Sequence, residues 1–136
     1  MIRTATLAAL SLLAVVSICS RGGDGSATLS PGTANYKSAL ATTIEWSKLA
    51  DFPASATNMS VTSLGGPFSR EFLVSFNAPI ADIDKWIADS PGTALTPPSI
   101  SGKTRTFTVS PGGGAQFAEV EVDEREQKVT IRAYWS

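Results

Sequence analysis

Apolar and polar residues alternate along much of the chain after residue 57, as they do in strands that bury one face. In the first two such segments the apolar positions are Met59, Val61, Phe68, Phe72, Val74 and Phe76. Gly65-Gly66-Pro67 separates the two segments, and glycine and proline favour turn conformations. The pattern therefore predicts a β-hairpin with one apolar face.

The end of the chain predicts a second hairpin with a defined register. If Glu124 to Gln127 form the loop, the inner pairs are all apolar, while the outer pairs join opposite charges or two aromatic rings. These pairs are Asp123 with Lys128, Val122 with Val129, Val120 with Ile131, Glu119 with Arg132, Ala118 with Ala133, and Phe117 with Tyr134. A further strand is expected from Thr104 to Ser110, and Pro111-Gly112-Gly113-Gly114 connects it to this hairpin.

Two segments have helical periodicity. Tyr36, Leu40 and Ile44 recur at helical spacing and predict an amphipathic helix over residues 34–50. Residues 79–89 predict a second helix, in which three isoleucines at positions 80, 83 and 87 share one face. Proline suits the first turn of that helix, and Ser90-Pro91-Gly92 ends it. We expect the Pro-, Ser- and Thr-rich residues 91–102 to form a loop.

The predicted order is a helix followed by ββαβββ. An α+β domain over residues 34–136 accounts for it, with an antiparallel sheet of about five strands, one helix packed on a face, and an additional N-terminal helix. The expected core is Met59, Val61, Phe72, Val74, Phe76, Ile80, Ile83, Ile87, Phe107, Val109, Val120, Val122, Val129, Ile131 and Trp135.

The first residues have the layout of an export signal. Arg3 supplies a positive start, and the run from Ala5 to Ile18 carries no charge. As a helix this run would rise only about 21 Å, whereas the hydrocarbon core of a bilayer is roughly 30 Å thick. We therefore interpret residues 1–18 as an export signal peptide.

Cys19, the only cysteine of the chain, follows the apolar run directly. Val16-Ser17-Ile18-Cys19 resembles the bacterial lipobox, whose cysteine receives a lipid, although Ile18 stands where that motif has a small residue. The alternative is cleavage by ordinary signal peptidase, which discards Cys19 or leaves it without lipid. The protein is thus expected in the cell envelope as a lipoprotein, or periplasmic or secreted. Residues 19–33 are rich in Gly and Ser and are expected to form a flexible leader.

The composition excludes several kinds of chemistry. The chain has 136 residues and contains no histidine, which removes the usual general base of hydrolases and the commonest zinc ligand. A single cysteine excludes an internal disulfide. The formal net charge is −1, which gives no general attraction to nucleic acid. We expect no cofactor, no metal and no enzymatic activity.

Three segments carry a resemblance. They are Asp82 to Thr93, the loop from Pro111 to Gln116, and the ending from Ile131 to Ser136. Together they resemble small exported bacterial proteins of unassigned function that carry a lipoprotein-like signal peptide. The resemblance covers about residues 45–136. It implies a bacterial origin and an exported location, and it implies no site residue.

Two arginines are candidate binding residues. Arg70 is in phase with Phe72, and Arg105 is in phase with Phe107, so both side chains are expected on the core side of the sheet. If both arginines lay at one rim of the sheet, they would form an anion site. The alternative is that each sits at a strand end and extends its charge to water.

Phe117 and Tyr134 are the other candidate binding residues, because the predicted register places both rings on the outer face of the sheet. With Trp46 they would form an apolar strip suited to a partner. Alternatively, the N-terminal helix covers this strip and the domain is a helix-sheet-helix sandwich.

The sequence leaves three classes of function. The first is a non-enzymatic interaction module of the envelope or exterior whose partner is a protein. The second is a small inhibitor or a binder of anions or small ligands that uses Arg70 and Arg105, and the third is a carboxylate-based enzyme. No nucleic-acid partner is expected, and contact with a membrane is expected only through an N-terminal lipid, if Cys19 receives one. The pattern does not indicate an oligomeric state.

Overall fold

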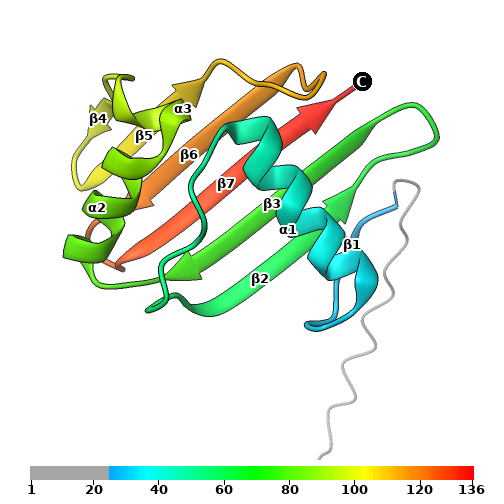
Figure 1. Ribbon diagram of the computed structural model, residues 1–136, viewed down its shortest axis with the longest axis horizontal. Coiled ribbons are helices and arrows are strands. Elements are labelled where there is room, and N and C mark those ends of the chain that lie inside the picture. Colours follow the sequence, from blue (N-terminus) through cyan, green and yellow to red (C-terminus); the bar gives the residue numbers. More distant parts are fainter. Residues whose placement is uncertain (1–24) are drawn as a thin grey trace, which may run out of the picture.

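A seven-stranded antiparallel sheet is the centre of the molecule. We describe residues 25–136 from a computed structural model. The strands lie in the order β1-β2-β3-β7-β6-β5-β4, so β3 and β7 are neighbours at the middle of the sheet (Figure 1). This confirms an α+β domain with an antiparallel sheet, but the sheet has seven strands where about five were expected.

The elements follow the chain in the order strand, helix, two strands, two helices and four strands. Their bounds are β1 Ala27–Thr28, α1 Ala34–Ser47, β2 Thr57–Leu64, β3 Arg70–Asn77, α2 Ile80–Asp89, α3 Pro91–Ala94, β4 Ser99–Ser101, β5 Thr104–Val109, β6 Phe117–Asp123 and β7 Lys128–Trp135. The two long predicted helices and both predicted hairpins are therefore present. Every residue pair predicted for the β6–β7 hairpin, from Phe117 with Tyr134 to Asp123 with Lys128, is also present.

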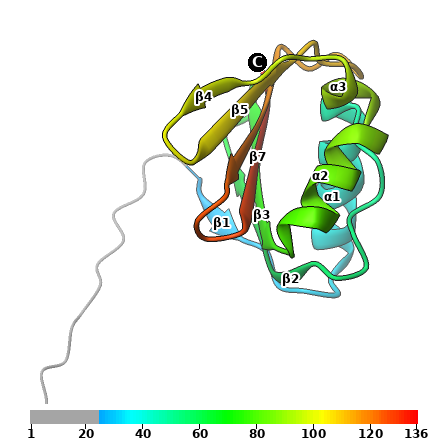
Figure 2. The same cartoon turned by 90° about the vertical axis from the view of Figure 1, so that its left-hand side faces the viewer.

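All three helices lie on the same side of the sheet, as Figure 2 shows. The buried row of α1 consists of the small residues Ala39, Thr43 and Ser47, which recur every fourth position. Small side chains allow the helix to lie close to the sheet, while Tyr36, Leu40 and Trp46 pack against the core from beside this row. Helix α2 buries Ile83, Trp86 and Ile87.

The core agrees with the expected one except at a few positions. Trp86 is buried within an aromatic cluster, where its ring centroid is 5.5 Å from that of Phe76 and 6.2 Å from that of Phe52. Trp135 was expected in the core but is 42% exposed at the end of β7. Phe68 was expected on the apolar face of the first hairpin but lies in its turn and is 84% exposed. Phe68 precedes the start of β3 at Arg70 and has no partner in the β2–β3 ladder.

Three short elements were not predicted. Strand β1 pairs with β2, and Leu29 next to it packs against the core, so the leader expected to run to residue 33 is partly built into the domain. The segment 91–102, predicted as a loop, contains helix α3 and strand β4. Strand β4 forms a hairpin with β5 across Gly102, whose φ of +58° lies in the left-handed region that glycine adopts readily.

The C-terminal end of α1 and the residues after it are joined by hydrogen bonds to two later segments, residues 90–92 and Gly112. The Gly92 N–H donates to the Lys48 carbonyl at 2.7 Å, and the Gly112 N–H donates to the Trp46 carbonyl at 3.0 Å. The Ala50 N–H donates to the buried Ser90 hydroxyl at 2.9 Å. The 111–114 segment therefore packs against the end of α1, where a Cβ atom at Gly113 would lie 2.7 Å from the Trp46 side chain.

Candidate functional site

The outer face of the sheet carries Phe117 and Tyr134 at one end of the β6–β7 pair. The two residues are directly opposite each other on β6 and β7, and both are half-buried. Because α1, α2 and α3 all lie on the other side, no helix of the described residues covers these rings (Figure 2). The predicted position of both candidate residues on the outer face is therefore present in the structure.

Arg132 of β7 contacts both Phe117 of β6 and Glu71 of β3. Its guanidinium carbon is 5.6 Å from the centre of the Phe117 ring, a distance at which a cation is attracted to the face of an aromatic ring. Its Nε donates to the carboxylate of Glu71 on β3. This hydrogen bond and the charge of Glu71 raise the pKa of Arg132 above its ordinary value. The Arg132 side chain is therefore paired with Glu71 on the outer face.

Phe117, Arg132 and Tyr134 line a depression of about 310 Å³, which we name the outer-face hollow. The sequence pattern paired Arg132 with Glu119, and the register places these residues opposite each other. The ion pair nevertheless forms with Glu71, because β3 lies on the other side of β7. The chemistry that the hollow offers is an ion-paired guanidinium beside two aromatic rings.

Trp46 does not belong to this surface. Its ring centroid is 5.6 Å from that of Phe72, whose side chain is buried on the helix side of the sheet. Helix α1 therefore packs on the same face as α2, and the alternative of a helix-sheet-helix sandwich is wrong for the described residues. The aromatic strip of the outer face consists of Phe117 and Tyr134 without Trp46.

Arg70 and Arg105 lie at opposite ends of the sheet. Arg70 is opposite Trp135 at the end of β7, whereas Arg105 is opposite Val122, which is in turn opposite Val129 near the start of β7. Figure 1 shows β3 and β5 starting from opposite ends. The two arginines therefore do not form one anion site.

Arg105 is occupied by carboxylates of its own chain. Its Nη2 lies 2.6 Å from Asp84 of α2, and its Nε lies 3.1 Å from Glu124 in the β6–β7 loop. The two ion pairs link the sheet to helix α2 and leave the guanidinium neutralised. The carboxylates of Asp84 and Glu124 are accessible to solvent, so we expect the two ion pairs to make a modest contribution to stability.

Comparisons with family models, with curated proteins and with solved structures find no match to this chain. Between residues 25 and 136, no helix is long and apolar enough to cross a bilayer. The same residues contain no group of three or more His, Cys, Asp or Glu side chains placed to hold a metal ion. Cys19 and the predicted signal peptide lie outside the described residues, so their assignment stays a prediction.

Proposed function

We propose that this chain is a non-enzymatic interaction module that is exported from a bacterial cell and binds a protein partner through the outer face of its sheet. The observation that supports this function is the outer-face hollow, in which Phe117, Arg132 and Tyr134 gather on a face that none of the described helices covers. Tyrosine and arginine are among the residues that dominate binding energy in protein interfaces.

The ion pair with Glu71 uses the Nε of Arg132, so the other N–H groups of the guanidinium are left for a partner. These donors remain close to the two rings, so a partner can bury an apolar side chain between them and accept a hydrogen bond at the rim. The partner we propose is a protein segment with an apolar or aromatic anchor.

Photo-cross-linking in the native envelope tests the interface. A photoreactive residue in place of Thr130, a neighbour of Arg132 on the outer face, should form a specific adduct with the partner. The double substitution Phe117→Ser and Tyr134→Ser should abolish this adduct, because it removes both anchoring rings. The amount of adduct is measured by immunoblotting.

The matched control carries the same photoreactive residue at Leu95, which is 95% exposed and follows α3 on the helix side. This position should give no adduct with the same partner. Equal adducts from Thr130 and Leu95, or an adduct that survives the double substitution, would show that the outer face is not the interface.

We further propose that a lipid on Cys19 anchors the module to a membrane, with export by the signal peptide of residues 1–18. The lipobox-like Val16-Ser17-Ile18-Cys19 supports this location. Cys19→Ser should move the protein from the membrane fraction to the soluble fraction, because one thioether-linked diacylglycerol supplies most of the membrane affinity. Cell fractionation measures the distribution. Mass spectrometry that finds a mature N-terminus after Cys19, without lipid, would contradict the anchor and leave a periplasmic or secreted protein.

A further inference from the structure

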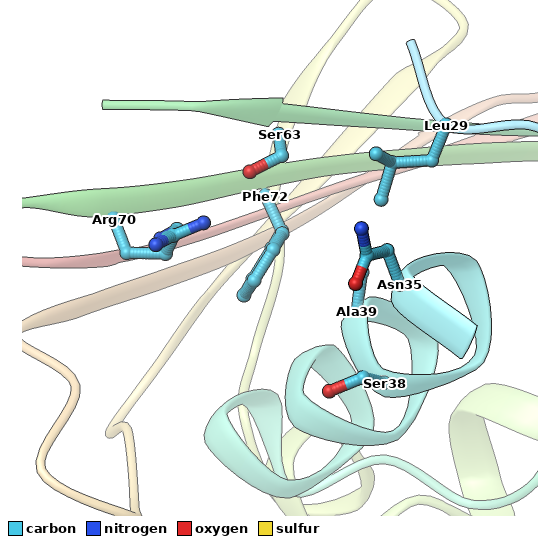
Figure 3. A pocket seen from close by; sticks show the side chains of 7 residues that line it. All are labelled: Leu29, Asn35, Ser38, Ala39, Ser63, Arg70 and Phe72. Atoms are coloured by element: carbon cyan, nitrogen blue, oxygen red, sulfur yellow. The ribbon is translucent and has the colours of Figure 1, made fainter. Parts of the chain in front are cut away.

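A second hollow lies on the helix side of the sheet, where the first turns of α1 approach β2 and β3 (Figure 3). Its volume is about 180 Å³. The apolar part of its wall consists of Leu29, Ala39 and Phe72. The polar part consists of the side chains of Arg70, Asn35, Ser38 and Ser63. We name it the Arg70 pocket.

Four segments of the chain build this pocket: Leu29 after β1, helix α1, and strands β2 and β3. Phe72 and Ser63 are directly opposite each other on β3 and β2, and Arg70 is two residues before Phe72, so the three side chains share one face. Asn35 is four residues before the buried Ala39 and therefore lies on the same side of α1. Figure 3 shows Arg70 and Asn35 on opposite sides of the opening.

The polar groups of the pocket have no partner within the part of the chain that the structure describes. The side chains of Arg70, Asn35, Ser38 and Ser63 make no hydrogen bond or ion pair to residues 25–136. The contrast with the other two arginines of the strands is direct, since Arg105 and Arg132 are both ion-paired. Arg70, Asn35 and Ser38 are exposed and Ser63 is half-buried, so these groups are hydrated in the free protein and their donors are available to a ligand beside the apolar wall.

We infer that the Arg70 pocket binds a carboxylate attached to a short apolar group. The planar guanidinium donates two parallel hydrogen bonds to a carboxylate, and the amide of Asn35 and the hydroxyl of Ser63 supply further donors. Phe72, Ala39 and Leu29 contact the apolar group.

Charge and size select this ligand class. Arg70 is the single cationic side chain of the pocket wall, which matches one carboxylate and leaves a phosphate dianion incompletely neutralised. The first turn of α1 contains no acidic residue that would repel an anion. The volume is below the usual range for drug-sized ligands, about 300 to 1,000 Å³, so the pocket has room for one small group. Such a group is either a free short-chain carboxylic acid or the C-terminal residue of a peptide.

Titration of the full-length, ¹⁵N-labelled protein tests the pocket. The probes are N-acetyl-leucine and its uncharged analogue N-acetyl-leucinamide, which differ only in the carboxylate. We expect saturable chemical-shift changes at the amides of Ala39 and Ser63 with the acid and not with the amide. Arg70→Gln should weaken binding of the acid about tenfold or more, since it removes the charge-assisted hydrogen bonds.

Two further variants serve as controls. Lys37→Gln removes one positive charge from an exposed position of α1 outside the pocket, and it should leave binding unchanged. Arg70→Lys keeps the charge but loses the planar pair of donors, so its affinity should fall between those of the parent and Arg70→Gln. Binding of the amide as tight as that of the acid, equal binding by Arg70→Gln and the parent, or no shift at the pocket would overturn the inference.

The affinities of two additional probes distinguish a free carboxylic acid from a peptide C-terminus. Isovalerate represents a free acid, and a tripeptide that ends in leucine represents a peptide C-terminus. Tighter binding of isovalerate supports the free acid, and tighter binding of the tripeptide supports the peptide. The double substitution Phe117→Ser and Tyr134→Ser should not alter either affinity, because those residues lie on the other face of the sheet.

Discussion

Ile83→Ala should lower the free energy of unfolding by about 2 to 5 kcal/mol. The Ile83 side chain is completely buried between α2 and the sheet, with a relative exposure of 0%. Its truncation removes apolar contact and leaves a cavity that the packed aromatic cluster around Trp86 cannot easily fill. Denaturant unfolding measures the change as a lower midpoint.

Ile100→Ala is the matched control, because it makes the same chemical change in β4, where the isoleucine is 70% exposed. It should shift the free energy of unfolding by less than about 0.5 kcal/mol. Equal midpoints for the two variants would mean that α2 contributes little to the stability of the domain.

The residue pairs of the C-terminal hairpin could be predicted because only one register pairs apolar residues on the inner face and opposite charges or aromatic rings on the outer face. Shifting the register by one residue would place Val120 and Val122 on the wet face and separate Glu119 from Arg132. The helix of residues 79–89 was predictable for a similar reason, since three isoleucines recur at helical spacing, and in α2 Ile83 and Ile87 are buried while Ile80 is partly buried. A clear hydrophobic pattern within one helix or hairpin predicts that element without knowledge of the elements packed against it.

The short elements lack such patterns. Ala27 and Thr28 of β1 are both exposed, and the strand is joined to β2 by its backbone, which any sequence could supply. Strand β4 is likewise exposed at all three of its residues. The buried face of α1 was also difficult to predict. The residues that it buries are Ala39, Thr43 and Ser47, and only Ala39 is apolar.

The candidate sites show which information a sequence does not contain. The phase of a strand predicts the face of a side chain, and it placed Phe117 and Tyr134 together and Arg70 beside Phe72. The end of the sheet at which a residue lies depends on strand order. Because β7 and β6 separate β3 from β5, the starts of β3 and β5 fall at opposite ends, so Arg70 and Arg105 are apart. The same strand order brings Glu71 to Arg132.

Gly92 of α3 lies in close contact with the end of α1. A Cβ atom at this position would lie 2.2 Å from the Ser47 carbonyl oxygen and 2.8 Å from Cγ1 of Val109. The first of these neighbours is backbone, and the second belongs to a side chain that is 3% exposed, so neither can move away freely. The Gly92 N–H also donates to the Lys48 carbonyl at 2.7 Å, which fixes the distance between the two segments.

Gly92→Ala should therefore lower the free energy of unfolding by about 3 kcal/mol or more, at the upper end of the range for overpacked positions. The added methyl group forces α3 away from α1 and breaks the Gly92–Lys48 hydrogen bond. Gly66→Ala is the control, because a Cβ at Gly66 meets no atom within 4 Å, and its midpoint should stay close to that of the parent. If the Gly92 variant unfolds at the same denaturant concentration as the Gly66 variant, the end of α1 has room to move, and the hydrogen bonds that join it to residues 90–92 do not hold the helical layer in place.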